Sequence, residues 1–592
     1  MKRTRFILLG LCISFAVHSA SGQEYMERFQ AYQQWNQNIT TPPTPEFLAF
    51  IQEQSPLATK LREKWLFQIA YNKDWATFAK YYQDSKSVSL RCYHLQAIYH
   101  QGQEQIALQD ARPLWLSGSS LPPACNEIFD NLVKSEYFNE TLLGQRILLA
   151  LNNRNLSLAR HLLKQYKPPR LEEANTLTDI YLHPEHITNL SPSELHSAYY
   201  LYGLNRLVNV KIQEAIKIWK QPNSKKMLNE AQQQAFLIHI NAFKTIHNHD
   251  DAPLWFAKIK PAYYNDNLLD WQIRYALRQQ NWPYVEYLIR HFHDQENPTW
   301  QYWLARSLEA QGKKEPAREI YQSLANERNY YGFLSSLRIN KSLTFANENA
   351  ITNLNNLKPY QPFTDQIKAL YLSKQTLTAS RLLNDFVLEL PKEDKSALAY
   401  WLAHDLKWHS KSLFLCNNDE LTNQLSLRFP LAYQDTIRKT SQNYNVSKGL
   451  IYAIIRQEST FHDDIVSPAG AQGLMQLMPS TAKVIAKSER IAYDDKTQLM
   501  SAQKNISIGT AYLRQLGKRF QHPVLVSAAY NAGPSRVVYW LKNHPPKQVD
   551  IWIETLPWQE TRNYLKNIIS FYAVYQYRMK ENPDLSDFMK PF

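Results

Sequence analysis

The chain has 592 residues, with 67 Lys and Arg against 53 Asp and Glu, which gives a formal net charge of +14. This length allows several domains, and the positive charge forms no run of clustered Lys and Arg, which argues against a nucleic-acid surface. No Cys or His residues have the spacing of a metal site, so we expect neither a metal nor a cofactor.

The first 22 residues have the pattern of a cleaved signal peptide. Three basic residues among the first five precede an apolar stretch, 6–17, that is too short to span a bilayer. Small residues place cleavage after Gly22, with cleavage after Ala20 as the alternative. Cys12 lies inside the apolar stretch, which disfavours a lipoprotein. We therefore expect an exported, periplasmic protein without a transmembrane segment.

Loss of the three basic residues lowers its net charge from +14 to +11, and an anionic envelope polymer is then a better candidate partner than nucleic acid.

Cleavage would leave three cysteines, Cys92, Cys125 and Cys416. In an oxidising compartment Cys92 and Cys125 are the favoured disulfide pair, because they are close in sequence and flank one helix-turn segment. The alternative is that all three are reduced and buried.

Between residue 23 and about residue 430, one amphipathic helix follows another without sustained alternation of period two. Three loose repeats, 65–81, 271–287 and 303–321, each contain an aromatic-led helix, a polar turn and a second helix. Helical hairpins of this kind bury their apolar faces only against neighbouring hairpins, so the pattern predicts an α-superhelical solenoid. The many Trp and Tyr side chains could line a carbohydrate groove, but at helical spacing they are more often part of a core.

The pattern changes twice towards the C-terminus. The repeats fade after about residue 362, and a proline-bearing segment, 428–433 (RFPLAY), precedes a region that contains six of the 14 glycines. We predict a signal peptide at 1–22, a solenoid domain at 23–362, a helical linker domain at 363–427 and a further domain at 428–592. Tight loops on a rigid scaffold are where chemistry is expected, which favours the last domain as the functional one.

A predicted helix in this domain carries a carboxyl group on its apolar side. Ser447 is the expected N-cap, and the apolar positions 451, 454 and 455 share one face with Glu458. Desolvation there would raise the pKa of Glu458 towards the range in which a carboxylic acid can donate a proton to a glycosidic oxygen. The alternative, which this pattern alone favours, is an exposed Glu458 or one paired with Arg456 or Arg562.

Three further clusters follow Glu458. Two glycines and two prolines in 467–479 (SPAGAQGLMQLMP) force a tight loop back over the end of the glutamate helix, and the loop carries Gln476 and Met478 with it. The segment 527–534 (SAAYNAGP) places Tyr530 and Asn531 at the end of a small-residue helix. The segment 557–564 (PWQETRNY) places Glu560 where another helix begins.

Together these clusters resemble the soluble lytic transglycosylases of glycoside hydrolase family 23, whose catalytic domain is similar in fold to goose-type lysozyme. The shared motifs are Glu-Ser at 458, Gly-Leu-Met-Gln at 473, Ala-Tyr-Asn-Ala-Gly at 529 and Glu-Thr-Arg-x-Tyr at 560, in the family's order. The helical body, 330–333 (YYGF) and 428–433 resemble the large periplasmic members with a ring-shaped superhelical domain. The resemblance therefore covers nearly the whole mature chain.

The resemblance implies a mainly all-α fold: a U-shaped α-superhelical domain, a helical linker and a lysozyme-like catalytic domain that is α+β but mostly α. It makes Glu458 the sole catalytic acid and base and makes Ser459 a residue that helps to hold the scissile sugar. Tyr530 would form a hydrogen bond near the catalytic carboxyl group. Asn531 is more suited to shaping its loop, and Met478 has the alternative role of a core residue. The substrate-binding residues implied are Ser459, Gln476, Met478, Tyr530, Asn531, Glu560 and Tyr564.

The implied reaction is cleavage of the β-1,4 bond between N-acetylmuramic acid and N-acetylglucosamine in peptidoglycan, without water, to form 1,6-anhydromuramoyl ends. Asp463 and Asp464 follow Glu458 closely and are the obvious candidates for a second carboxylate, but their position predicts a solvated turn. The expected partners are glycan strands and proteins of cell-wall synthesis and remodelling, with the chain itself a monomer. The alternatives are a goose-type lysozyme hydrolase, which would give reducing ends, and a non-catalytic scaffold that binds peptidoglycan.

Overall fold

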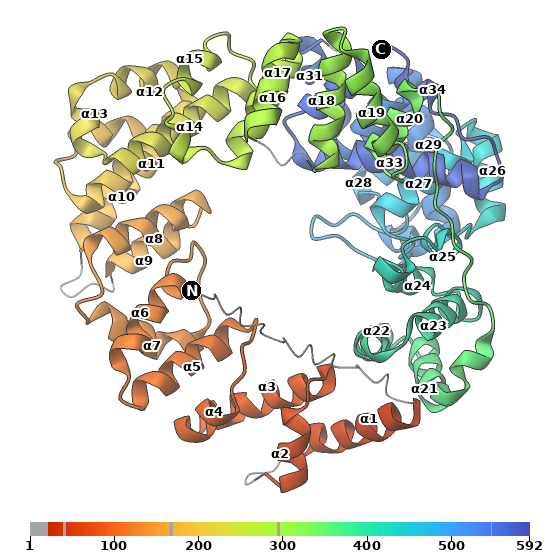
Figure 1. Cartoon of the computed structure of the whole chain (residues 1–592), viewed down its shortest axis with the longest axis horizontal. Helices are drawn as coiled ribbons and strands as arrows, with labels where there is room; N and C mark the ends of the chain where they lie inside the picture. Colours follow the sequence, from red (N-terminus) through yellow and green to blue (C-terminus); the bar gives the residue numbers. More distant parts are fainter. Residues whose placement is uncertain (1–21, 40–42, 165–169, 293–295, 418, 546–547) are drawn as a thin grey trace, which may run out of the picture. The chain divides into compact units, whose positions relative to one another are not determined.

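The computed structural model describes residues 22–592 except 40–42, 165–169, 293–295, 418 and 546–547. Residues 1–21 of the predicted signal peptide, with Cys12 and the alternative cleavage site at Ala20, lie outside the described residues. The described chain is a succession of helices (Figure 1), and its β-structure consists of two isolated bridges, Val466 with Gln472 and Gln472 with Leu477. Among the described residues, no helix combines the length and the apolar character needed to cross a bilayer.

The chain forms two compact units, each assembled from separate stretches of sequence. The first unit comprises the residues up to 61, together with 346–515 and 571–583; the second comprises 62–345, 516–570 and 584–592. The predicted domains, with boundaries at residues 22, 362 and 427, are consecutive stretches of the chain, whereas each of these units combines separate stretches. The predicted boundaries stay predictions.

Most helices of the first unit follow residue 346. They are α1 (Gly22–Gln37), α2 (Pro45–Gln52), η4 (Leu354–Tyr360), α21 (Gln361–Leu372), α22 (Thr376–Phe386), η5 (Val387–Glu389), α23 (Lys392–His404), α24 (His409–Leu415), η6 (Asp419–Leu421), α25 (Leu425–Arg428), α26 (Gln434–Tyr444), α27 (Lys448–Glu458), α28 (Pro479–Ser488) and η7 (Lys496–Met500). Three helices continue from one unit into the other, α3 (Pro56–Tyr71), α29 (Ala502–Phe520) and α33 (Gln559–Arg578).

The second unit contains the helical body. Its helices are α4 (Trp75–Tyr81), α5 (Val88–His100), α6 (Glu104–Trp115), η1 (Pro123–Cys125), α7 (Asn126–Val133), α8 (Glu140–Asn152), α9 (Leu156–Lys164), α10 (Leu171–Leu182), η2 (Pro184–Asn189), α11 (Glu194–Val210), α12 (Ile212–Trp219), α13 (Pro222–Met227), α14 (Glu230–Ile246), α15 (Ala252–Phe256), η3 (Pro261–Tyr263), α16 (Asp266–Gln279), α17 (Trp282–Phe292), α18 (Pro298–Ala310), α19 (Lys314–Leu324), α20 (Tyr330–Arg338), α30 (Pro523–Ala532), α31 (Pro534–Asn543), α32 (Val549–Thr555) and α34 (Ser586–Met589).

The predicted repeats are helical hairpins. The range 271–287 falls on α16 and α17, and 303–321 falls on α18 and α19; the helices of each pair pack against each other (Figure 1). Gly312 has a φ of +79° in the turn after α18, a conformation that glycine adopts without steric cost. The prediction of helical hairpins is therefore confirmed.

The Trp side chains in the first helix of each repeat belong to the core. Trp65 and Trp303 are fully buried, and Trp271 is 6% exposed. The ring of Trp65 meets that of Tyr81 edge to face, with the centroids 5.3 Å apart. At these three positions the aromatic residue is a packing residue and not the lining of a groove.

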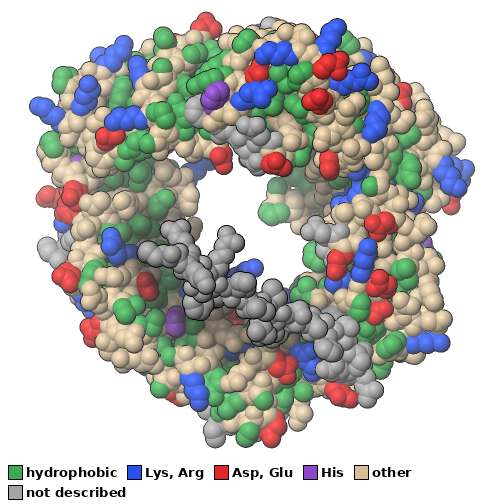
Figure 2. Space-filling model, in the orientation of Figure 1, with side chains coloured by type: hydrophobic (Ala, Val, Ile, Leu, Met, Phe, Trp, Pro, Cys, Tyr) green, Lys and Arg blue, Asp and Glu red, His purple; other side chains and the backbone are tan. Residues whose placement is uncertain are grey.

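Charge is dispersed over the surface. On the face that Figure 2 shows, Lys and Arg side chains are scattered among Asp and Glu and form no continuous patch. This distribution agrees with the absence of clustered basic residues in the sequence.

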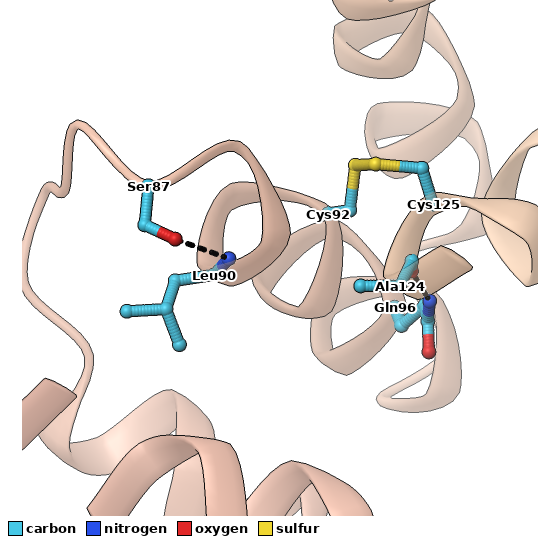
Figure 3. Close-up of a disulfide and its surroundings, with 6 residues drawn as sticks. All are labelled: Ser87, Leu90, Cys92, Gln96, Ala124 and Cys125. Carbon is cyan, nitrogen blue, oxygen red and sulfur yellow. Dashed lines mark hydrogen bonds between the residues drawn. A yellow bond between two sulfur atoms is a disulfide. The ribbon is translucent and has the colours of Figure 1, made fainter. Parts of the chain in front are cut away.

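Cys92 on α5 and Cys125 at the end of η1 form a disulfide (Figure 3). Their sulfur atoms lie 1.99 Å apart and their Cα atoms 5.0 Å apart, and both residues are fully buried. Gln96 Nε2 also donates a hydrogen bond to the carbonyl oxygen of Ala124 at 2.6 Å. Two kinds of link therefore hold α5 against the segment before α7, while Cys416 is a buried free thiol.

We expect replacement of Cys92 by Ser to lower the free energy of unfolding by about 3 to 4 kcal/mol. The bond closes a loop with a sequence separation of 33 residues, and constraint of the unfolded chain by a loop of this length accounts for a loss of about that size. Denaturant unfolding of the oxidised protein and the variant measures the difference. Cys416→Ser is the matched control, since it removes a buried thiol without opening a loop; an equal loss in both variants would contradict the prediction.

Candidate active site

Helix α27 carries the predicted catalytic glutamate at its C-terminal end. Ile451, Ile454 and Ile455 are fully buried, whereas Glu458 is half-buried as the last residue of the helix. Ser447 is the N-cap residue, as predicted, but its side chain forms no capping hydrogen bond. The helix is thus held by its apolar face, which fixes the direction of its last turn and of Glu458.

Arg456, in the last turn of α27, anchors this helix. Its Nε donates a hydrogen bond to the carbonyl oxygen of Arg428 at 3.1 Å, and its guanidinium lies 5.4 Å and 5.1 Å from the ring centroids of Phe429 and Phe571. Burial lowers the pKa of Arg456 to about 10. Arg456 was one of the two ion-pair partners that the sequence suggested for Glu458. In the structure it links α27 to the segment 428–433.

A strained turn follows Glu458 directly. Ser459 is 5% exposed and donates its hydroxyl to the carbonyl oxygen of Ile455 at 3.2 Å. The next two residues, Thr460 (φ 55°) and Phe461 (φ 62°), are both left-handed, a conformation that is rare for a β-branched residue and that costs about 1–3 kcal/mol at each position. Burial of the Phe461 ring, which is 3% exposed, offsets part of this cost. The chain therefore reverses immediately after the glutamate.

The two aspartates that follow lie on the solvent side of this turn. Asp463 Oδ2 accepts a hydrogen bond from the Tyr433 hydroxyl at 3.4 Å, and Asp464 Oδ1 lies 3.0 Å from His462 Nε2. Both aspartates are exposed. The interpretation of this segment as a solvated turn is confirmed.

The loop after this turn folds back on itself around two glycines. Gly473 N donates to the carbonyl oxygen of Ile465 at 3.0 Å, and Gly470 and Gly473 have φ values of +90° and +71°. A Cβ atom on Gly473 would lie 2.2 Å from the carbonyl oxygen of Leu499 and 2.4 Å from Asn505 Nδ2. Both the backbone conformation and the packing therefore require glycine at position 473.

Asn505, on α29, is hydrogen-bonded to this loop. The sequence analysis did not identify this residue. The residue is fully buried; its Nδ2 donates to the carbonyl oxygens of Gln472 and Leu499, each at 2.9 Å, and its Oδ1 accepts from Met475 N at 2.8 Å. The sequence did contain an indication that Asn505 is buried and hydrogen-bonded. Asn505 stands three residues before Ile508 and four before Gly509, on the buried stripe of its helix, where a polar residue needs partners.

Replacement of Asn505 by Ala should lower the free energy of unfolding by about 3 kcal/mol or more. The change leaves two carbonyl groups and one N–H buried without their partner, and each such group costs about 1–3 kcal/mol. Urea unfolding measures the loss. Asn543→Ala is the control, because the Asn543 side chain is exposed and bonds only to the carbonyl oxygen of Tyr539 four residues earlier. Similar losses in the two variants would show that Asn505 does not hold the loop.

Gln476 and Met478 lie at the end of the loop. Gln476 has a φ of 46°, and its Nε2 donates to the carbonyl oxygens of Gly473 at 2.9 Å and Ile465 at 3.3 Å, so its amide nitrogen stabilises the loop itself. Met478 is the N-cap of α28 and is 39% exposed. The alternative assignment of Met478 to the core is therefore wrong.

The remaining predicted site residues lie on α30 and α33, in the second unit. Tyr530 is half-buried near the end of α30, and Asn531 Oδ1 accepts a hydrogen bond from Thr561 Oγ1 at 2.7 Å. Asn531 thus joins the end of α30 to the beginning of α33, in keeping with a role in shaping its loop. Glu560 is exposed, whereas Tyr564 is 3% exposed. Contacts of these residues with substrate stay predictions.

The structure thus divides the predicted site residues between its two units. Glu458, Ser459, Gln476 and Met478 belong to the first unit, and Tyr530, Asn531, Glu560 and Tyr564 belong to the second. The described residues contain no group of His, Cys, Asp and Glu that could hold a metal ion.

A buried ionic network in the second unit surrounds α32. Asp550 Oδ2 accepts from Arg306 Nε at 2.9 Å and from the Tyr302 hydroxyl at 2.8 Å. One turn later, the carboxylate of Glu554 is paired in the same way, and its exposed fraction is 1%. Sequence analysis missed both residues, although two carboxylates four residues apart within an apolar segment, 549–556 (VDIWIETL), are an unusual pattern.

Glu554 is bonded through both of its oxygens. Oε1 accepts from Arg274 Nε and Nη2, each at 3.2 Å, while Oε2 accepts from the Tyr331 hydroxyl at 2.7 Å and from Lys566 Nζ at 2.8 Å. Burial acts to raise the pKa of Glu554, but the charges of Lys566 and Arg274 outweigh it and hold the pKa at about 2. The hairpin helices α16 and α20 are therefore joined by ion pairs and hydrogen bonds to α32 and α33, which lie some 220 to 290 residues further along the chain.

Comparison with known proteins identifies relatives of this chain. Residues 435–553 match the family model described as "Transglycosylase SLT domain". The soluble lytic murein transglycosylase of Escherichia coli (strain K12) is 26% identical over 568 residues, which cover 94% of this chain and 88% of that protein. The enzyme of the same name from Salmonella typhimurium is 27% identical over 547 residues, covering 90% and 84% of the two chains.

Solved structures give the same result over almost the whole chain. An inactive mutant of lytic transglycosylase Slt from Pseudomonas aeruginosa superposes with a TM-score of 0.83 at 28% identity, covering 95% of this chain and 94% of that one. The 70 kDa soluble lytic transglycosylase of Escherichia coli superposes with a TM-score of 0.74 at 25% identity, covering 95% and 93% of the chains.

Proposed function

Because the chain belongs to the soluble lytic murein transglycosylases, we propose that Glu458 is the single acid and base with which it cleaves glycan strands. The chain is a peptidoglycan lytic transglycosylase, and the predictions of this activity and of a mainly helical fold with a superhelical body and a lysozyme-like domain are confirmed. The observation that supports the assignment of Glu458 is its half-buried position at the end of the apolar helix α27, directly before the strained turn at Thr460 and Phe461.

In the first step of the proposed reaction, protonated Glu458 donates its proton to the oxygen of the β-1,4 bond between N-acetylmuramic acid and N-acetylglucosamine. The bond from this oxygen to C1 of the muramoyl residue breaks, and the bonding electrons leave with the oxygen. The 2-acetamido group of the muramoyl residue stabilises the positive charge that develops at C1.

In the second step, the Glu458 carboxylate accepts the proton of the C6 hydroxyl group of the same muramoyl residue. The C6 oxygen forms a bond to C1 and closes the 1,6-anhydro ring. Glu458 is then protonated again, and no water has been consumed. One group that first donates and then accepts a proton is sufficient for this sequence.

The state of the two aspartates that follow Glu458 in sequence favours this lyase reaction over hydrolysis of the goose-lysozyme type. Retaining and inverting glycosidases of the usual kind need a second carboxylate, as nucleophile or as base. The two aspartates nearest in sequence, Asp463 and Asp464, are exposed and interact with Tyr433 and His462. Membership of an enzyme family also counts against the alternative of a non-catalytic scaffold.

We further propose that the chain acts in the periplasm on the glycan strands of peptidoglycan. Support comes from the signal-peptide pattern of residues 1–22 and from relatives that are named murein transglycosylases. A monomeric state and association with proteins of cell-wall synthesis and remodelling stay predictions.

Mass spectrometry of the products tests the proposed reaction. Purified murein is digested in water enriched in oxygen-18, and we expect muropeptides with 1,6-anhydromuramoyl ends that are lighter than hydrolysis products by one water and carry no heavy oxygen. Products with reducing ends that contain solvent oxygen would instead assign the chain to the hydrolases. A digest with Glu458→Gln controls for contaminating enzymes.

A further inference from the structure

Helix α33 connects the helical body with the part of the chain that carries Glu458. Its residues up to 570 belong to the second unit, which contains the body, and those from 571 belong to the first unit, which contains Glu458. The helix is unbroken (Figure 1), and its 20 residues include neither glycine nor proline, the residues at which helices most often kink. A displacement of one half of α33 is therefore expected to move the other half.

Lys566 links the first half of α33 to the helical body. Its Nζ donates to the Tyr331 hydroxyl at 2.7 Å and to Glu554 Oε2 at 2.8 Å. The Tyr331 hydroxyl itself donates to Glu554 Oε2 at 2.7 Å, so the lysine, the tyrosine and the carboxylate form a closed triangle of hydrogen bonds. Tyr331 lies on α20, in the segment 330–333 (YYGF), and is 7% exposed. The triangle therefore ties α33 to a buried part of the body.

The first turn of α33 is held by a different partner. Thr561 Oγ1 donates to Asn531 Oδ1, 30 residues earlier, which ties this turn to the end of α30. Lys566, in contrast, reaches a partner 235 residues earlier in the chain. Loss of the bonds of Lys566 therefore removes a polar link to the body but leaves in place the bond that holds the first turn, which carries Glu560.

The second half of α33 packs against α27, the helix that ends at Glu458. The ring of Tyr575 stacks on that of Tyr452 with the centroids 4.9 Å apart, and the guanidinium of Arg456 lies 5.1 Å from the ring centroid of Phe571. Residues four apart share one face of a helix, so Tyr452 and Arg456 form the face of α27 that lies along α33. The place of α27 therefore depends on the place of α33.

We propose that Lys566 is a positioning residue for the reaction: its bonds to Tyr331 and Glu554 set the place of α33, and α33 sets the place of α27 and of Glu458. The proposal rests on the proposed function, in which Glu458 is the acid and base. Such a group must lie within hydrogen-bond reach of the proton that it transfers. A misplacement of about 1 Å, caused far from the reacting atoms, can lower a rate about 100-fold. The body thus contributes to catalysis through Tyr331.

The first test compares the steady-state kinetics of the full-length protein with those of Lys566→Met and Arg274→Met on soluble glycan strands, at a temperature at which all three are folded. Methionine keeps much of the lysine stem but removes the ammonium group. In Lys566→Met we expect kcat to fall about tenfold or more and KM to change less than about threefold, because the first turn of α33 keeps its own bond. Arg274→Met removes another partner of Glu554 and leaves the bonds of Lys566 intact, so kcat should fall less than about twofold.

An unchanged kcat in Lys566→Met would overturn the proposal. An equal fall of kcat in Lys566→Met and Arg274→Met would also overturn it, since the loss would then follow the stability of the network and not the place of α33. A rise of KM at unchanged kcat would assign Lys566 to substrate binding and reject a positioning role. Lys542→Met, at an exposed lysine of α31, is the control for the loss of one positive charge and should keep the wild-type kcat.

Tyr331→Phe keeps the test valid if Lys566→Met does not fold, because this change removes a single hydroxyl group. We expect kcat to fall about threefold or more in Tyr331→Phe. The double variant should lose no more of kcat than Lys566→Met alone, because both changes break the same triangle of hydrogen bonds. An unchanged kcat in Tyr331→Phe, or additive losses in the double variant, would reject the link through α20.

Hydrogen exchange separates this proposal from the proposed reaction, because it does not depend on turnover. Backbone amides in the last turn of α27, which ends at Glu458, should exchange about fivefold or more faster in Lys566→Met than in the wild type or in Arg274→Met. If this turn exchanges alike in all three proteins, α33 does not link Lys566 to α27 and the proposal fails, while the assignment of Glu458 is unaffected. Turnover by Glu458→Gln, measured separately, would instead reject the proposed function.

Discussion

Glu458→Gln is expected to abolish turnover of murein while the protein still folds and binds glycan strands. The amide keeps the shape of the side chain but cannot donate a proton to the glycosidic oxygen or take one from the C6 hydroxyl group. General acid and base catalysis contributes about 10²- to 10⁴-fold to a rate, and here one residue has both roles. The release of anhydromuropeptides from purified sacculi measures turnover, and sedimentation with insoluble murein measures binding.

The matched control is Asp463→Asn, a change of the same kind at an exposed carboxylate five residues away that interacts with Tyr433. This variant should keep at least about half of the wild-type rate. If Glu458→Gln retained more than a few per cent of turnover, the assignment of the catalytic residue would be rejected. If both variants lost activity equally, the effect would belong to the turn and not to Glu458.

Arg274→Met is expected to lower the free energy of unfolding by about 3–5 kcal/mol, the usual cost of removing one partner from a buried ion pair. Arg274 is 6% exposed, and its guanidinium bonds to Glu554 through two nitrogens and to Asp270 Oδ2 at 3.1 Å. Methionine fills much of the space of the arginine stem but leaves the Glu554 carboxylate with fewer partners in the protein interior. Denaturant unfolding, followed by circular dichroism and fluorescence, measures the loss.

Arg438→Met is the control for this experiment, because Arg438 pairs with Asp435 at 3.0 Å on the surface, with both side chains well exposed. Surface pairs of this kind contribute about 0–1 kcal/mol. A loss in Arg274→Met no larger than in Arg438→Met would show that the network around α32 does not contribute to stability.

The ion pair between Arg274 and Glu554 also makes the stability of the protein depend on pH. The folded-state pKa of Glu554 is about 2, below its ordinary value of 4.5, so the folded protein holds the carboxylate ionised at pH values where the unfolded chain takes up a proton. Stability from this group is therefore fully present above about pH 4.5 and is lost as the pH falls towards 2. Glu554→Gln should be less stable at neutral pH but should lose less between pH 5 and pH 2. Parallel pH profiles for the two proteins would contradict this account.

The sequence by itself determined the local features of this protein. Periodicity placed the helical hairpins, because a helix with one apolar face must bury that face against a neighbour. The same rule placed Glu458 on the buried side of α27. It also predicted that aromatic residues such as Trp65 and Trp303 belong to the core. The ordered motifs from Glu458 to Tyr564 were sufficient to identify the family, since each is a short stretch whose residue types can be read without knowing what packs against it.

Only the tertiary structure decided which distant residues serve as partners. Asn505 bonds to a loop some 30 residues earlier, and Glu554 bonds to Arg274, 280 residues before it. No local pattern encodes such pairs, because a buried amide or carboxylate can be stabilised by any donor that the fold brings within about 3 Å.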